Sequence, residues 1–214
     1  IATAMLRCSY TPVTLCRMPN PGSDPEILEA ARSAFERYGY VGATLERIAK
    51  AAGVSRVTLH RRGVTKDGLL AELVSRATED YRRLMWPALT GDGSGAERLA
   101  QALDALCDAA EANMSLLVAL RAQSDGVFHR QGEEQALTRS VFTEPLERLL
   151  RDGIADGSLR EVEPLEAATV LFNLVGRTYV HMRTGHGWSP EHARAAVLDP
   201  VLNGLRALDR ERVA

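Results

Sequence analysis

Aromatic side chains are scarce in this 214-residue chain, because Phe, Trp and Tyr together make up 5% of it. A surface on which sugars or RNA bases stack needs several aromatic rings, so we expect no such surface. The three cysteines, Cys8, Cys16 and Cys107, are odd in number, widely spaced and without a CxxC pair. Their spacing argues against a disulfide framework or a thiolate zinc site and favours a reducing compartment.

Long apolar runs are also missing. The longest candidate, around Ala167–Val175, is interrupted by Thr169 and Asn173 and is far shorter than the roughly 18 residues of a membrane span. We therefore expect no membrane insertion and a cytoplasmic protein. The net charge is −2, so the overall charge indicates no polyanionic partner, and any basic surface must be local.

The remaining pattern is helical from Asp24 onward, and no alternating strand pattern competes with it. Residues 1–23, rich in Thr, Pro, Gly and Ser, are expected to form a flexible N-terminal arm. Helix-start and helix-stop residues give the expected elements, with Asp24, Thr44, Ser55, Thr65 and Ser189 at helix starts and Gly39 as the stop of the first helix. These elements are 25–38, 45–52, 56–62, 66 to about 84, 96–112, a buried 114–124, 133–155 with a kink at Pro145, 164–184, and a last helix that starts at Pro190. The predicted fold class is all-α.

Two short helices joined by AAGVS, with Thr44 and Ser55 as N-caps, have the form of a helix-turn-helix. The window 47–66 contains six basic side chains and no carboxylate. Although a run of charge is usually a solvated face, six unopposed cations on this motif favour DNA binding. The six cations are Arg47, Lys50, Arg56, Arg61, Arg62 and Lys66.

The second short helix is the expected recognition helix, because the major groove of DNA is wide enough to hold an α-helix. Near its N-terminal end, Arg56, Val57 and His60 are predicted to face base edges. Arginine can donate two hydrogen bonds to guanine, and valine can make an apolar contact with a thymine methyl group. Five further side chains are predicted to contact phosphates, which fix register without reading sequence. They are Thr44, Thr58, Arg61, Arg62 and Lys66.

Three motifs follow one another in residues 27–70. They are AxxxFxxxGY (Ala31–Tyr40), IAxxAGVSxxTL (Ile48–Leu59) and TKxxLL (Thr65–Leu70). Together they resemble the DNA-binding domain of the TetR (tetracycline repressor) family of transcriptional regulators. The later stretch PLERLLRDGIADGSLR (Pro145–Arg160) also resembles the C-terminal domain of that family. The resemblance is strong over the first third of the chain and looser after it.

This resemblance implies a homodimer that binds a palindromic operator in double-stranded DNA. It implies a DNA-binding head at 24–68 and a helical ligand-binding and dimerisation domain at 69–214, whose last two helices pair across the two-fold axis. A small-molecule effector, whose identity the sequence does not give, would change the separation of the two recognition helices and release a repressor. No cofactor is implied.

Apolar and aromatic residues of the C-terminal part either line an effector pocket or are ordinary core, and core is the commoner case for any one of them. The candidates are Met114, Phe128, Phe142, Phe172, Asn173, Tyr179 and Met182. Asn173 is the most suggestive of them, because a buried amide needs a partner.

Two features depart from the family pattern. His60 stands where tyrosine is usual, and Gly63 stands where a large apolar residue is usual, so Gly63 removes an expected apolar contact. A helical ligand carrier with a degenerate head is therefore an alternative. An all-α enzyme is another, but no nucleophile–base pair, HExxH or phosphate loop is present. His181, His186 and His192 match no standard zinc spacing and are expected to be surface or interface residues.

Overall fold

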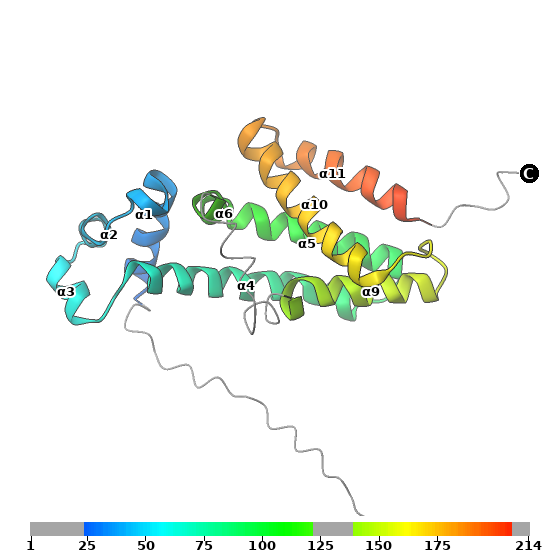
Figure 1. The fold of residues 1–214 in the computed structure, drawn as a ribbon, viewed down its shortest axis with the longest axis horizontal. Coiled ribbons are helices and arrows are strands. Elements are labelled where there is room, and N and C mark those ends of the chain that lie inside the picture. Colours follow the sequence, from blue (N-terminus) through cyan, green and yellow to red (C-terminus); the bar gives the residue numbers. More distant parts are fainter. Residues whose placement is uncertain (1–23, 122–138, 207–214) are drawn as a thin grey trace, which may run out of the picture.

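The computed structural model describes residues 24–121 and 139–206, and every regular element in these ranges is a helix (Figure 1). The predicted all-α class is thus confirmed. The elements are α1 (Pro25–Gly42), α2 (Leu45–Ala51), α3 (Arg56–Arg61), α4 (Lys66–Thr90), α5 (Gly95–Ala112), α6 (Met114–Arg121), a short π-helix η1 (Arg139–Thr143), α9 (Glu144–Ala155), α10 (Pro164–Gly185) and α11 (Pro190–Leu205). The expected arm at 1–23 and the candidate Phe128 lie outside the described residues.

The helix starts follow the predicted caps. At each, a side-chain oxygen accepts a hydrogen bond from a backbone N–H in the first turn, which satisfies a donor that the helix itself leaves free. The residues that do so are Asp24, Thr44, Ser55, Thr65 and Ser189. Gly39, with φ 65°, interrupts the helical geometry of α1 as predicted, although α1 extends to Gly42.

Two predictions about the middle of the chain differ from the structure. The helical run next to Pro145 changes from the π-helix η1 to α9 at Glu144, so Pro145 lies in the first turn of α9 and not inside one continuous α-helix, and residues 133–138 of the predicted helix lie outside the described residues. The helix expected at 114–124 is not buried on all sides, because the side chain of Val118 on α6 is 43% exposed. Helix α4 also continues past the expected end near Leu84 to Thr90.

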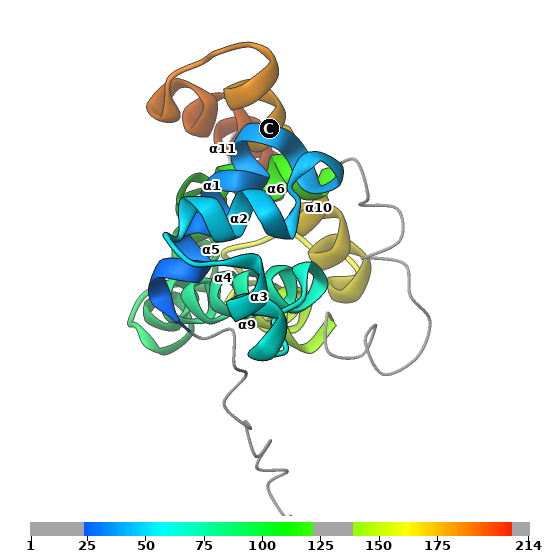
Figure 2. The ribbon, with the colours of Figure 1, turned by 90° about the vertical axis from the view of Figure 1, so that its left-hand side faces the viewer.

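The buried apolar side chains form two clusters. One joins α1, α2, α3 and the start of α4, and includes Phe35, Ile48 and Leu59. The other joins the second half of α4 with α5, α9, α10 and α11, and includes Leu103 and Tyr179. In the ribbon, α1–α3 lie at one end of an elongated molecule and α9–α11 at the other, with α4 running between them (Figures 1 and 2).

Helix α6 contributes to both clusters. Leu116 and Ala119 are buried among the residues of the first cluster, where α6 packs against α1. Met114 and Leu117 pack against the second cluster. Because protein interiors are close-packed, a shift of α6 must disturb both clusters.

Helices α5 and α9 approach each other most closely at two glycines. A Cβ on Gly95 would overlap the backbone of Gly153, and a Cβ on Gly153 would meet the side chain of Leu159. The same crossing holds the start of α5 with two hydrogen bonds, from the Gly95 N–H to Asp156 at 2.6 Å and from the Ala96 N–H to Ser158 at 3.0 Å.

Gly95→Ala is therefore expected to lower the free energy of unfolding by about 1–3 kcal/mol, as overpacking against atoms that cannot yield does. Denaturant unfolding followed by circular dichroism measures it. The matched control is Gly176→Ala in α10, where a Cβ meets no atom within 4 Å and alanine should add about 0.5–1 kcal/mol. Equal stability of the two variants would contradict this account of the crossing.

No helix in the described ranges is both long and apolar enough to cross a bilayer.

Candidate nucleic-acid interface

The turn between α2 and α3 is built on a glycine. Gly53 has φ 66°, its N–H bonds to the Lys50 carbonyl, and the Val54 N–H bonds back to the Ala49 carbonyl at 3.0 Å. This is the Schellman arrangement, in which a left-handed residue lets the last carbonyls of a helix find donors. Ser55 then caps α3 by accepting from the Thr58 N–H at 3.0 Å. The turn and cap together fix the direction of α3.

The same arrangement ends α3. Gly63 has φ 66°, the Gly63 N–H bonds to the His60 carbonyl, and the Val64 N–H bonds to the Leu59 carbonyl, both at 3.0 Å. Val64 is buried at 5% exposure and Leu59 at 0%, which is the apolar pair that often accompanies this ending. Gly63 itself has no side chain for the apolar contact expected at this position, and the buried Val64 next to it belongs to the cluster that joins α3 to the start of α4.

One face of α3 points away from the protein. Leu59 is the residue that α3 buries, whereas Arg56, Val57, His60 and Arg61 are exposed. Val57 is 66% exposed, a large value for an apolar side chain that packs against nothing. In the ribbon, α3 lies at the tip of the molecule, which leaves this face open to a large partner (Figure 1).

The six cations of window 47–66 divide into two groups. Arg47 donates to the Gly42 carbonyl and lies over the Tyr38 ring, and Arg62 pairs with Asp24 at 3.3 Å. Lys66 donates to the Tyr40 carbonyl at 3.1 Å. The side chains of the other three cations have no hydrogen bond or ion pair to any residue within 24–121 and 139–206, and these are Lys50, Arg56 and Arg61.

Unpaired exposed cations are the ones free to meet an anion without first breaking a contact. Arg56 and Arg61 both lie on the outward face of α3, so the predicted base-reading and phosphate-contacting groups are brought together there. Thr44 is exposed, and its hydroxyl oxygen caps α2. Thr58 is half-buried, and its hydroxyl is 2.8 Å from that of Ser55, so its first role is within the turn.

Sequence reasoning missed the partners of Arg62 and Lys66. Asp24 was assigned only as an N-cap, and Tyr40 only as part of a motif. The Tyr40 hydroxyl donates to Asp67, and the Tyr40 ring stacks on Phe35 at 5.7 Å between centroids. These partners are 26 to 38 residues apart in the chain, so no local spacing gives them.

Comparison with known proteins supports this geometry. Residues 27–73 match the sequence profile described as "Bacterial regulatory proteins, tetR family". The HTH-type transcriptional repressor AcnR of Corynebacterium jeikeium is 30% identical over 150 residues, which cover 70% of this chain and 75% of AcnR. The chain belongs to the TetR family.

Solved structures, one of them described as a TetR family regulator, have the same fold. PfmR of Thermus thermophilus, a TetR family transcriptional regulator, is 25% identical with a TM-score of 0.67, covering 86% of this chain and 96% of PfmR. AibR, solved in complex with isovaleryl coenzyme A and operator DNA, is 18% identical with a TM-score of 0.63, covering 84% of this chain and 96% of AibR. In this TetR family member, Gly63 closes α3 with a regular helix ending.

The candidate effector residues fall into different environments. The rings of Tyr81, Phe142 and Phe172 form a packed run with centroids 5.2 Å apart at each step. Met114 is half-buried beside the same cluster. Asn173 was expected to be buried, but it is exposed. Its amide donates to the Thr169 carbonyl of its own helix at 2.9 Å. The apolar surroundings of Asn173 in the sequence misled the prediction.

Tyr179 is fully buried, and its hydroxyl donates to Glu111 at 2.9 Å. Glu111 also receives two hydrogen bonds from Arg183, at 2.7 and 2.9 Å. This group ties α5 to α10, and it explains Tyr179 as a structural residue. The hydrogen bonds from Arg183, aided by that from Tyr179, hold the pKa of Glu111 below its ordinary value of 4.5.

A carboxyl with a lowered folded pKa stabilises the protein above its ordinary pKa of 4.5, and this contribution is lost as the pH falls through the folded pKa. The midpoint temperature of unfolding is therefore expected to fall on acidification below that value, and to fall less in Glu111→Gln. Scanning calorimetry across this range measures it. The control is Glu79→Gln, an exposed carboxyl paired only along α4, and an equal response in both variants would contradict the assignment.

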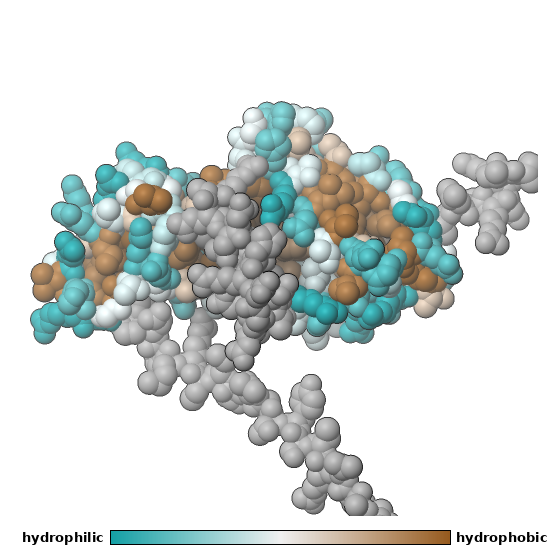
Figure 3. All heavy atoms as spheres, in the orientation of Figure 1, coloured by the Kyte–Doolittle hydropathy of each residue, from teal (hydrophilic) through white to brown (hydrophobic). Residues whose placement is uncertain are grey.

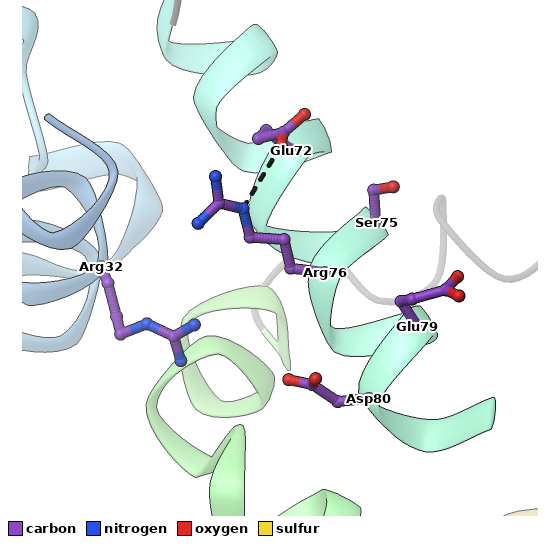
Figure 4. Close-up of a pocket in the computed structure, with 6 residues that line it drawn as sticks. All are labelled: Arg32, Glu72, Ser75, Arg76, Glu79 and Asp80. Atoms are coloured by element: carbon purple, nitrogen blue, oxygen red, sulfur yellow. Dashed lines mark hydrogen bonds and ion pairs between the residues drawn. The ribbon is translucent and has the colours of Figure 1, made fainter. Parts of the chain in front are cut away.

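A groove of about 550 Å³ separates α1 from the middle of α4 (Figure 4). Arg32 of α1 points into it, and α4 supplies the facing polar side chains. They are Glu72, Ser75, Arg76, Glu79 and Asp80. Each charged member is paired on its own helix, such as Arg76 with Glu72 at 3.3 Å and Arg32 with Glu29 at 3.7 Å. None of the candidate effector residues lines this groove.

The three histidines and Trp188 form a row of ring contacts at the turn between α10 and α11, in the order His181, His186, Trp188 and His192. His181 and His186 lie edge to face at 5.1 Å, and Trp188 and His192 at 4.4 Å. Within the described part of the chain, no group of three or more His, Cys, Asp or Glu is placed to hold a metal ion. Cys107 is buried, which raises the pKa of its thiol to about 12 and keeps it uncharged.

Proposed function

We propose that this TetR family member is a dimeric transcriptional repressor that binds a palindromic operator and leaves it when a small-molecule effector binds. The observation that carries the proposal is the outward face of α3, where Arg56, Val57, His60 and Arg61 are exposed and the two arginines have no partner among the described residues. Such a helix fits the major groove of DNA. A role on DNA also favours a cytoplasmic protein.

The division of labour that we propose for the interface is as follows. Arg56, Val57 and His60 read bases, and Thr44 and Arg61 contact phosphates. Thr58, Arg62 and Lys66, the other expected phosphate contacts, each have a partner within the protein. For Arg62 we retain the phosphate contact as a proposal, since its guanidinium keeps unused N–H donors. For Thr58 we retain it because the Ser55 hydroxyl can be the donor of the bond between them, which leaves the Thr58 O–H for a phosphate.

Dimerisation is proposed through α10 and α11. Val170 and Leu174, one turn apart on α10, are 58% and 46% exposed, and the space-filling view shows hydrophobic atoms gathered over α10 on the face turned to the viewer (Figure 3). Exposed apolar patches of this kind mark interfaces. Two copies related by a two-fold axis would bury the same patch against itself.

The effector site is proposed in the second cluster, with Met114, Phe142 and Phe172 as lining residues, while Asn173 is withdrawn and Tyr179 is assigned to structure. The complex of AibR with isovaleryl coenzyme A and operator DNA supports an effector-responsive repressor by analogy. We propose 24–68 as the DNA-binding part and 69–214 as the ligand-binding and dimerisation part. Helices α4 and α6 contribute to both clusters, so a ligand that favours one arrangement of the body shifts the heads.

The test is fluorescence anisotropy of the full chain over a salt series, with random duplex as control. The specific duplexes are the DNA upstream of its own gene and sequences selected by the protein from a random library. A repressor is expected to bind a specific duplex well above the control, with a steep salt dependence. Failure to bind any duplex at low salt would contradict DNA binding and favour the ligand-carrier alternative.

A further inference from the structure

Lys66 is the first residue of α4, a position where a cation is unfavourable. The N-terminus of a helix carries a partial positive charge, and a lysine there adds to it. Thr65 caps the helix, and Asp67, the second residue, supplies the favourable charge. Lys66 therefore needs a local partner of its own if its ammonium group is to lie against the protein.

Tyr40 provides that partner twice. The Lys66 ammonium donates to the Tyr40 carbonyl at 3.1 Å and lies 4.2 Å from the centre of the Tyr40 ring. The Tyr40 hydroxyl in turn donates to Asp67. Two consecutive residues of α4 thus hold one residue in the last part of α1, directly after the break at Gly39. We call Tyr40, Lys66 and Asp67 the α4 clasp.

The α4 clasp lies between the helix-turn-helix head and the second hydrophobic cluster, whose relative orientation determines how the head meets DNA. On one side, Tyr40 stacks on Phe35 in the core of the head and precedes the cap of α2 by four residues. On the other side, α4 runs into the second cluster, where Tyr81 and Met85 are buried. The clasp therefore fixes the angle at which the helix-turn-helix leaves α4.

We propose that Lys66 is a positioning residue for operator binding, acting through Tyr40, and not a phosphate contact. This inference rests on the proposed function and corrects the phosphate-contacting role expected from the sequence. An ammonium group that lies over the Tyr40 ring and donates to the Tyr40 carbonyl gains little from a phosphate, because it must leave these contacts first. Without the clasp, the heads sample more orientations, and DNA binding must order them at a cost in affinity.

A phosphate contact and a positioning contact differ in their salt dependence. Loss of one phosphate contact reduces the slope of log affinity against log salt by about 0.9. Loss of a positioning contact lowers affinity at every salt concentration and leaves the slope unchanged. The full-length variants to compare are Lys66→Met, Tyr40→Phe, Arg61→Met and Tyr38→Phe, each measured on a duplex that the wild-type protein selects from a random library.

Tyr40→Phe removes only the hydroxyl that donates to Asp67, and it is expected to weaken binding by at least about threefold, the low end of one hydrogen bond, with an unchanged slope. Lys66→Met is expected to do the same. Arg61→Met is the phosphate-contact standard and should flatten the slope by about 0.9. Tyr38→Phe is the matched control, because the Tyr38 hydroxyl has no hydrogen bond among residues 24–121 and 139–206, and it should bind as the wild type does.

A slope for Lys66→Met that flattens as much as that of Arg61→Met overturns the proposal, and so does wild-type affinity in Tyr40→Phe. Thermal unfolding of each variant identifies any that fail to fold. If Lys66→Met is one of them, Lys66→Gln, which also removes the charge, takes its place in the comparison of slopes, because Tyr40→Phe leaves both contacts of Lys66 intact. If the wild-type protein selects no sequence, the proposed function fails instead, so the two failures are distinguishable.

Discussion

Replacing Arg56 with alanine is expected to remove most of the sequence discrimination. Arg56 is the first residue of α3, exposed and unpaired among the described residues. A good bidentate contact from arginine to guanine is worth about 1–3 kcal/mol against the wrong base. Since a dimer loses one such contact in each half-site, affinity for the selected operator should fall by at least about thirtyfold. Competition anisotropy with operator and random duplexes measures this effect.

The control for Arg56→Ala is Arg82→Ala, which removes the same charge from a side chain of α4 that pairs with Glu79 at 3.3 Å. It should leave the ratio of operator to random affinity unchanged. Affinity for random duplex should change much less than affinity for the operator in Arg56→Ala. An equal loss on both duplexes would assign Arg56 to the phosphate backbone and would leave base reading to Val57 and His60.

Leu174→Asp is expected to convert the proposed dimer into a monomer. The side chain is 46% exposed on α10 beside Val170, and a carboxylate at a two-fold interface would be buried close to its own symmetry copy. Burying unpaired like charges costs several kcal/mol. The monomer should lose operator affinity by more than about a hundredfold, because one head then binds without the help of the other.

Analytical ultracentrifugation and operator binding test this prediction together. The matched control is Val118→Asp on α6, where an apolar side chain of similar exposure, 43%, is replaced by the same carboxylate. That variant should stay dimeric at concentrations where Leu174→Asp sediments as a monomer. A dimeric Leu174→Asp would show that the proposed seam on α10 is not the interface.

Most of the fold was predictable because its signals are local. A capping side chain such as Ser55 or Ser189 bonds to a backbone N–H within three residues, and the turn at Gly53 ends its helix through bonds that span three and five residues. Pro145 was misjudged because the same residue breaks a helix in its middle and starts one in its first turn. Choosing between the two requires knowledge of where α9 begins.

The site was predictable in outline but not in its assignments. The basic window and the outward face of α3 follow from spacing, since Leu59 alone of its short run is fully buried. Which cations are free does not follow, because Arg62 and Lys66 find partners 38 and 26 residues away. Asn173 illustrates the converse, since an amide in an apolar run was satisfied by the carbonyl one turn back in its own helix.

Because α6 packs in both hydrophobic clusters, the DNA-binding head of this protein cannot be separated from the rest of the chain at the end of the helix-turn-helix. Leu116 and Ala119, some fifty residues beyond the helix-turn-helix, complete the core around Ile27 and Leu28. A fragment that stops after the helix-turn-helix would therefore leave part of that core open to water, a serious loss for so small a unit. A chimaera that joins this head to the body of a relative will need matching residues at 116 and 119. In this chain, the unit that evolution or an engineer can exchange is the head together with the face of α6 that covers it.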